Sequence, residues 1–380
     1  MIGAEGSSAG LLARAGWRPF RLALVTACAL RLLYSGAAAL LVPVLDLNPA
    51  RISSNRLTSG LLQRSDGLVY ALWGVWQRFD TLFYVHIAQY GYDRPEAVVF
   101  YPLYPLLLRA AAPLTGSALA AAPLVSTVAV FFLLWGVHRL LALDLDRGAA
   151  ARATMFYAIW PVAFMFFAGY AEGLVAALIV WTLYFARTGR WWAAGLCGFA
   201  APLAKAIGAL VILPLAVLVW KDRTRRTLPA LLCLAGPLAF PAWLAATGRP
   251  LPTDVYASYW HVRFDWPWAT LAHGFQLASQ NPFIACHLLL LAFAAVTAFV
   301  KPLRAEYVVY TAAVLLFLLT KSGPLSPPEP LGRYALVLFT APAGLAQLVR
   351  DRAPAAITSA IFMAINFAVL FGFLSWALVV

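Results

Sequence analysis

The stretch FYPLYPLLLRAAAPL, residues 100–114, decides how this chain crosses a membrane. It contains Pro102, Pro105 and Pro113, with Arg109 among them, and its apolar core is about a dozen residues long, whereas a spanning helix needs roughly 20. We therefore expect a re-entrant or interfacial helix on the outer side of the membrane. A full span here would move every later loop to the opposite side.

The composition of the whole chain supports a membrane location. Of its 380 residues, 63% are hydrophobic and 11% are charged, whereas soluble domains carry roughly a quarter charged residues. Long apolar runs recur from Leu22 to the C-terminus without the alternation typical of β-barrel strands. The sequence therefore predicts an all-α polytopic membrane protein.

The positive charges of the chain follow the pattern of membrane-protein loops. The net charge is +13, and Lys and Arg gather in short clusters between apolar runs. This distribution argues against nucleic acid as a partner. Arginines also precede the first apolar run, which is long for a signal peptide and is expected to be the first membrane helix. The four cysteines lie in or beside apolar segments without the spacing of a metal site, so they are expected to be core residues.

Hydropathy and loop charge together predict about eleven membrane helices in a single domain covering residues 1–380, with a cytoplasmic N-terminus. The expected helices are 20–45, 118–141, 153–170, 172–187, 191–204, 206–220, 228–246, 283–300, 304–320, 332–349 and 355–378. The extracytoplasmic loops are then 46–116, with interfacial helices, 247–282 and 321–332. High Ala, Arg and Pro usage points to a bacterial plasma membrane.

The segment RFDTLFYVHIAQYGY, residues 78–92, carries the densest chemical signal. Asp80 precedes a stretch in which Phe83, Tyr84 and Ile87 share one helical stripe, so we expect a helix lying along the membrane surface. Two interpretations of Asp80 are open. Its carboxylate either caps this helix or acts as a catalytic group at the membrane boundary.

This segment resembles the first-loop signature of the PIG-V-type mannosyltransferases, a family with the GT-C architecture that uses lipid-linked sugars. The matching residues are Asp80, Tyr84, Ile87, Ala88, Gly91, Tyr92, Pro102, Leu103, Tyr104 and Pro105. Later stretches resemble the family in the same order. They are 160–174, with Tyr170 and Glu172 retained, 186–215, 258–268 and 332–339. Departures are Phe79 in place of Trp, Ala171 and Gly173 in place of serines, and Ala204-Lys205 in place of Thr-Arg.

The resemblance implies an inverting glycosyltransferase that moves mannose from a polyprenyl-phosphate donor to an acceptor hydroxyl outside the membrane. Asp80 would be the general base. The expected donor-phosphate residues are Arg78, Lys205, Arg333 and Tyr334, and the expected substrate-binding residues are Tyr84, His86, Tyr104, Tyr170, Glu172 and Trp260. No metal ligand is assigned, and dependence on a divalent metal stays open. The acceptor is a glycan, a glycolipid or a protein, and membrane lipid is the other expected partner.

Other interpretations remain open for several of these residues and for the chain. Glu172 either contacts substrate or only neutralises Lys205 or Arg333, and Arg333 either binds phosphate or anchors a helix end. The aromatic residues around Trp260 suit sugar stacking or an interfacial belt. A transporter or flippase for a polyprenyl-linked lipid would need the same apolar groove and cations, and a catalytically silent subunit would keep the fold.

Overall fold

The computed structural model describes residues 6–45, 61–301, 304–322 and 331–376. Parts of two predicted outer loops, 46–60 and 323–330, lie outside these residues. The longer helices are α1 (Gly6–Leu41), α6 (Ala118–Leu141), α7 (Arg147–Ala158), α8 (Glu172–Arg187), α9 (Trp191–Ala204), α10 (Ile212–Asp222), α11 (Gly236–Ala246), α14 (Pro282–Val300), α15 (Ala305–Leu319), α17 (Thr340–Leu348) and α18 (Arg352–Leu374).

Shorter elements join these helices. They are α3 (Leu68–Leu72), α4 (Asp80–Tyr90), α5 (Leu103–Thr115), α12 (Pro252–Ser258), α13 (Pro267–Ala278) and α16 (Leu331–Tyr334), with the 3-10 turns η1 (Val42–Val44), η2 (Arg64–Asp66), η3 (Gly74–Trp76), η4 (Pro95–Val99), η5 (Ala163–Phe167), η6 (Ala206–Val211), η7 (Arg225–Ala235) and η8 (Ala335–Val337). Strands β1 (Arg263–Phe264) and β2 (Lys321–Ser322) pair antiparallel.

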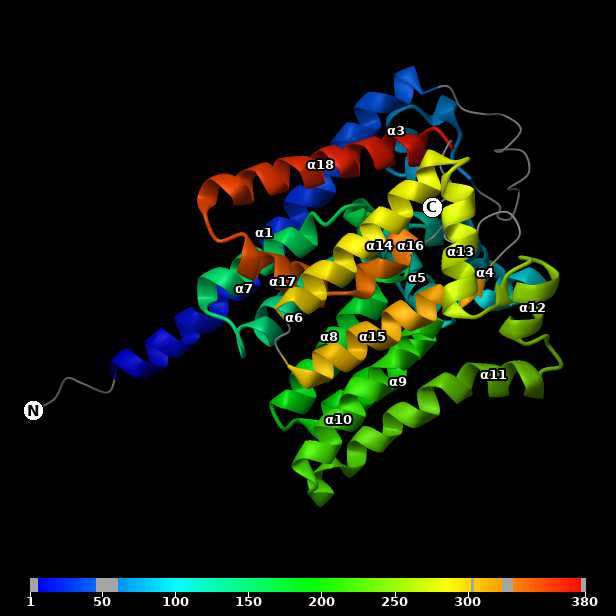
Figure 1. The fold of residues 1–380 in the computed structure, drawn as a ribbon. Helices are drawn as coiled ribbons and strands as arrows, with labels where there is room; N and C mark the ends of the chain where they lie inside the picture. Colours follow the sequence, from blue (N-terminus) through cyan, green and yellow to red (C-terminus); the bar gives the residue numbers. More distant parts are fainter. Residues whose placement is uncertain (1–5, 46–60, 302–303, 323–330, 377–380) are drawn as a thin grey trace, which may run out of the picture.

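The helices form a bundle in which α8 is central. It packs against α6 and α9, while α4 and α5 pack on each other and on α6. Figure 1 shows α1 as a long helix along one side, with α18 crossing it and the α9–α11 region on the other side. The start of α4 lies beside the residues that precede α8, because the Thr81 hydroxyl donates a hydrogen bond to the carbonyl oxygen of Ala168.

Four helices in the described part of the chain are long and apolar enough to cross a membrane, as expected for an integral membrane protein. They are Arg18–Leu41, Ala118–Leu141, Arg225–Ala246 and Arg352–Leu374. Shorter apolar helices cover Trp191–Ala204, Ile284–Val300 and Ala305–Leu319. The count of eleven spans stays a prediction.

Three helices, α6, α8 and α9, begin and end at the residues predicted from the sequence. The expected continuous helix 153–170 is wrong. Helix α7 ends at Ala158, and the chain then turns at Trp160 and Pro161 before η5, because proline disfavours helical backbone at the residue before it. The expected helix 332–349 is also interrupted, since α16 and η8 end before α17 begins.

The short helix α5 replaces a full span at residues 103–115, in agreement with the sequence. Helix α4 differs from its expectation. Residues Thr81 to Ala88 are all buried, so α4 is enclosed by protein on every face and does not lie along a surface. Its aromatic side chains pack against α5 and neighbouring loops, with Phe83 stacked on Phe100.

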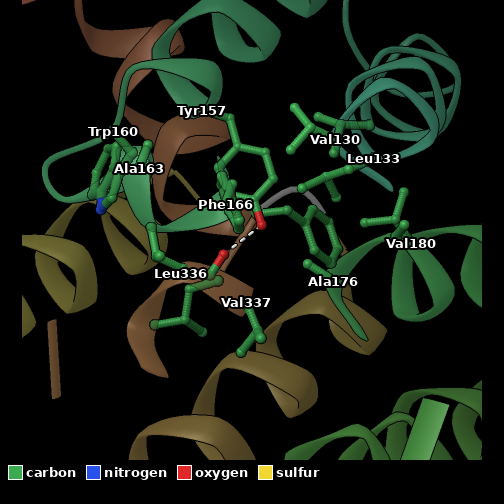
Figure 2. Close-up of a cluster of buried hydrophobic side chains, with 14 of the residues drawn as sticks. Val130, Leu133, Tyr157, Trp160, Ala163, Phe166, Ala176, Val180, Leu336 and Val337 are labelled. Carbon is green, nitrogen blue, oxygen red and sulfur yellow. Dashed lines mark hydrogen bonds between the residues drawn. The ribbon is translucent and has the colours of Figure 1, made fainter. Parts of the chain in front are cut away.

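The core joins the later helices to α7. Figure 2 shows Tyr157, whose hydroxyl donates a hydrogen bond to the carbonyl oxygen of Leu336, surrounded by apolar side chains that include Phe166 and Val180. The Tyr310 hydroxyl donates to the next carbonyl, that of Val337, at 3.0 Å. Two buried tyrosines therefore fix η8, and with it the residues that precede it in α16.

Candidate functional site

Five charged side chains meet where α4, α8 and α16 begin, and we call them the Arg333 cluster: Asp80, Glu172, Lys205, Lys321 and Arg333. Arg333 Nη1 lies 2.9 Å from Asp80 Oδ2, and its Nε lies 3.0 Å from Glu172 Oε1. Lys205 Nζ forms a second ion pair with the same Glu172 oxygen. One arginine thus bridges two carboxylates.

Asp80 is placed by a sharp turn. The preceding residue, Phe79, has φ 46°, which is uncommon for a residue with a side chain, and it caps α4 without a side-chain hydrogen bond. The interpretation of Asp80 as the capping residue is therefore wrong. Asp80 is the first residue of α4, and its carboxylate contacts Arg333. Strain at such a position is frequent at functional sites.

A second contact holds the start of α4 against the start of α8. Thr81 donates a hydrogen bond to the carbonyl oxygen of Ala168 at 2.7 Å. The next residue, Gly169, has φ 82°, and a β-carbon there would lie 3.0 Å from the Thr81 side chain. Only glycine fits this turn, and the turn delivers Tyr170 and Glu172 to the cluster.

Glu172 is the more enclosed of the two carboxylates. Its side chain is 1% exposed, whereas the side chain of Asp80 is 21% exposed. Glu172 begins α8, where the helix dipole favours negative charge. Its Oε2 accepts no hydrogen bond from a described residue. Asp80 is therefore the carboxylate that an incoming molecule can reach.

Arg333 is held at the centre of the cluster by the packing of its neighbours. Gly332 lies so close to His287 that a β-carbon would approach its Nδ1 to 2.9 Å. The Arg333 guanidinium lies 5.1 Å from the ring centroid of Tyr170 and 5.0 Å from that of Tyr334. The aromatic faces add cation–π attraction to the two ion pairs.

Lys321 was not assigned a role from the sequence, yet it belongs to this cluster. Its ammonium group lies 4.9 Å from the ring of Tyr256 and 5.5 Å from that of Tyr334, and it forms no ion pair with a described residue. The ammonium group of Lys205 lies 4.3 Å from the centroid of the same Tyr334 ring. Tyr334 therefore stands among three cations.

The pairing of β1 with β2 brings Lys321 into place. Lys321 is opposite Phe264 in this two-residue ladder. The pairing joins the predicted outer loops 247–282 and 321–332, which are distant in sequence. A ladder of two residues leaves no periodic signal, so nothing in the sequence marked Lys321 or Tyr256.

Four further candidate residues surround the cluster or support α4. Burial, together with the charges of Glu172 and Asp80, raises the pKa of Tyr84 well above its usual range. Tyr104 packs edge-on against Tyr84 at 4.9 Å and bonds to Ser126. The Tyr170 hydroxyl has no hydrogen-bond partner among the described residues. Trp260 packs against Phe83 at 5.6 Å.

Two candidate residues make their contacts elsewhere. The Arg78 side chain donates a hydrogen bond to the Tyr70 hydroxyl at 2.9 Å and lies over the ring of Trp376. His86 Nε2 lies 2.6 Å from Asp93 Oδ1, towards the other end of α4. Neither contact is with a member of the Arg333 cluster.

The electrostatics of Asp80 suit proton transfer. Burial raises the pKa of its carboxyl above the usual range, and the charges of Arg333 and Lys205 act in the opposite direction. A carboxylate becomes a better base as its pKa approaches the working pH. Within the described residues there is no group of three His, Cys, Asp or Glu arranged to hold a metal ion.

The architecture and the cluster define a class: an all-helical integral membrane protein with a partly open ion cluster at one end of the bundle. Among solved structures, the fold is similar to ArnT from Cupriavidus metallidurans, determined bound to undecaprenyl phosphate. The TM-score is 0.50 and the sequence identity 17%, over 76% of this chain and 58% of the ArnT chain. No protein-family model and no curated protein matches the chain.

The likeness to ArnT concerns the fold. This chain spans 58% of the length of ArnT, and at 17% identity the bundle is shared while side chains are free to differ. The prediction of an all-helical membrane protein is confirmed, and its fold is similar to that of ArnT.

Proposed function

We propose that this protein is a membrane glycosyltransferase that moves a sugar from a polyprenyl-phosphate donor to an acceptor hydroxyl, with Asp80 as general base. The observation that carries the proposal is the asymmetry of the Arg333 cluster. A buried carboxylate, Glu172, holds two cations in place, while Asp80 stays partly exposed beside them. Cations for a lipid phosphate and a base for a hydroxyl thus stand side by side.

The proposed reaction needs one proton acceptor and one stabilised leaving group. The acceptor oxygen attacks the anomeric carbon from the face opposite the phosphate, and the configuration inverts. The bond from that carbon to the phosphate oxygen breaks, and its electron pair leaves with the polyprenyl phosphate. The hydroxyl proton passes to Asp80. Lys205, Lys321 and Arg333 stabilise the growing negative charge on the leaving phosphate, which lowers the barrier.

Donor binding would also prepare the base. Without substrate, Asp80 is paired with Arg333 at 2.9 Å. A donor phosphate competes for the same guanidinium, and a carboxylate that loses a positive neighbour has a higher pKa and is a stronger base. Tyr170 and Tyr334, whose rings face Arg333, are suitably placed to contact the phosphate or the sugar.

The finer assignment rests on the sequence resemblance to the PIG-V-type family. That resemblance supports mannose as the sugar and the extracytoplasmic side as the site of transfer. The fold of ArnT, whose structure contains undecaprenyl phosphate, supports a polyprenyl-phosphate donor. The acceptor would be a glycan, a glycolipid or a protein.

Donor binding and sugar transfer, measured in the same detergent-purified sample with polyprenyl-phosphate mannose, test the proposal. We expect the wild-type protein to bind the donor and transfer its sugar. Asp80→Asn should bind and not transfer, and Asp265→Asn, which changes an exposed carboxylate of loop 247–282, should do both. Binding without transfer by the wild type would instead indicate a lipid transporter, and the absence of both would indicate a silent subunit.

A further inference from the structure

A second opening lies at the other end of α4 from Asp80. It is a groove of about 510 Å³ between the C-terminal end of α4, helix α5 and helix α11, and we call it the α4–α11 groove. None of its lining residues belongs to the Arg333 cluster. Ile87, near its inner end, is seven residues along α4 from Asp80, a rise of about 10 Å.

Part of the groove lining is apolar and exposed on the surface of the protein. Leu106 of α5 and Trp243 of α11 line it and are 56% and 42% exposed, and the buried Phe240 lines it as well. Large apolar side chains so exposed on a membrane protein face lipid chains. A lipid can therefore enter the groove from the bilayer.

Two arginines also line this groove. Arg249 Nε donates a hydrogen bond to the carbonyl oxygen of Tyr92 at 3.0 Å, and its guanidinium lies 5.0 Å from the ring of Trp243. Arg109 is exposed. Neither arginine forms an ion pair with a described residue. Each guanidinium consequently has donors available to an anion.

One carboxylate shares the groove with these arginines. Asp93 lines it and is 49% exposed on its side chain, and its Oδ1 contacts His86 Nε2 at 2.6 Å. This hydrogen bond turns one Asp93 oxygen towards the protein. The lining therefore holds two arginines and one aspartate, and one oxygen of that aspartate is already hydrogen-bonded to His86. This excess of positive charge favours an anionic ligand.

From this combination, we infer that the α4–α11 groove binds a membrane lipid with an anionic phosphate head group. Its chains would lie against Leu106, Phe240 and Trp243, and its phosphate would bind Arg109 and Arg249. Guanidinium groups match phosphate oxygens in bidentate geometry, and burial of the chains adds hydrophobic stabilisation. This lipid site is separate from the Arg333 cluster and does not depend on the proposed transfer reaction.

Native mass spectrometry of the full chain with phosphatidylglycerol or phosphatidylcholine tests the inference. We expect the wild type to retain phosphatidylglycerol at least tenfold more strongly, and Arg109→Gln/Arg249→Gln to lose this preference. Arg263→Gln, which changes an exposed arginine outside the groove, should keep it. Millimolar inorganic phosphate should not displace the lipid, because it cannot fill the apolar walls.

Two results would overturn the inference: equal retention of both lipids by the wild type, or an unchanged preference in the double variant. If the double variant does not fold, Arg109→Gln alone serves, since this side chain is exposed. It should reduce the preference severalfold, and an undiminished preference would be equally decisive. Binding of the polyprenyl-phosphate donor should be unaffected in each variant, because the Arg333 cluster is intact.

Discussion

The two ends of α8 carry ion clusters that have the same numbers of acidic and basic residues but differ in how completely these residues are paired. At the end of α8 away from Glu172 lies the Arg187 cluster, which we define as Asp144, Arg187, Lys221, Arg304 and Glu306. Each cluster has two carboxylates and three cations. The fifteen-residue rise of α8 from Glu172 to Arg187 separates them by about 22 Å.

The hydrogen-bonding groups of the carboxylates in the Arg187 cluster are all satisfied. Arg187 binds both Asp144 oxygens, with Nη2 to Oδ1 at 2.8 Å, and the Tyr307 hydroxyl also donates to Asp144. The two Glu306 oxygens accept from Arg304 and from Lys221. Every carboxylate oxygen in this cluster has a partner.

The Arg333 cluster is not satisfied in this way. Glu172 Oε2 accepts no hydrogen bond from a described residue, and Lys321 contacts aromatic rings without an ion pair in the described part of the chain. A closed network suits a structural clamp, whereas an open one suits ligand binding. The comparison therefore supports a structural role for the Arg187 cluster and the proposed ligand-binding role for the Arg333 cluster.

The strongest test replaces one carboxylate in each of the two clusters by its amide. We expect Asp80→Asn to lower sugar transfer by roughly 10²–10⁴-fold with little change in melting temperature, because the shape is kept and the base is lost. Asp144→Asn should leave transfer per folded molecule unchanged and lower the free energy of unfolding by about 3 kcal/mol, because Arg187 loses its charged partner. Turnover and thermal melts of both variants provide the comparison. Equal loss of turnover in both would contradict it.

The buried glutamates give the next test. Glu172→Gln and Glu306→Gln should each destabilise the protein by about 3 kcal/mol, since each removes a buried carboxylate that two cations share. Added polyprenyl phosphate should restore the melting temperature of Glu172→Gln, because its phosphate replaces the missing anion. It should not restore that of Glu306→Gln. Equal recovery of the two variants would show that phosphate does not bind at the Arg333 cluster.

Part of the fold and part of the Arg333 cluster could be predicted from the sequence. Helix α6 begins where expected because Ser117 caps it, its side chain accepting a hydrogen bond from the amide of Ala120. Loop charge placed Asp80, Glu172, Lys205 and Arg333 on one side of the bundle, and the structure brings these four residues together.

What the sequence did not predict depends on long-range contacts. The sequence predicts Arg78 as one of the donor-binding cations, yet its side chain donates a hydrogen bond to the Tyr70 hydroxyl. The Arg187 cluster also joins segments that are distant in sequence, and its two carboxylates, Asp144 and Glu306, carry no signal in the sequence that pairs them with these cations.

The lysines of the two clusters provide a smaller effect. We expect Lys205→Ala to weaken donor-lipid binding about tenfold and Lys205→Arg to weaken it less, because a phosphate contact requires positive charge before a particular shape. Lys221→Ala, the matched change in the Arg187 cluster, should leave donor affinity unchanged. Titration with the donor lipid measures all three. Unchanged affinity in Lys205→Ala would make Lys205 only a partner of Glu172.

The smallest effect is expected for Lys321→Gln. This loss of a buried charge should not lower the stability of the donor-free protein. Burial, together with the charges of Lys205 and Arg333, lowers the pKa of Lys321. The charged form therefore costs folding free energy, and that cost grows as the pH falls from the usual lysine pKa to the lowered pKa, below which it is constant. Removing the charge should leave the donor-free protein equally or slightly more stable, whereas the same change in Lys221 should destabilise it.

Donor binding should reverse the shift in the pKa of Lys321. A phosphate beside the ammonium group favours its charged form and raises its pKa, so the wild-type protein takes up a proton on binding. Donor affinity should then fall as the pH rises from the lowered pKa of the free protein towards the raised pKa of the complex. Lys321→Gln should bind the donor severalfold more weakly at low pH and show a flatter pH dependence. Calorimetric titration in buffers of different ionisation enthalpy measures the proton uptake, and the same uptake in wild type and variant would exclude Lys321 from the phosphate site.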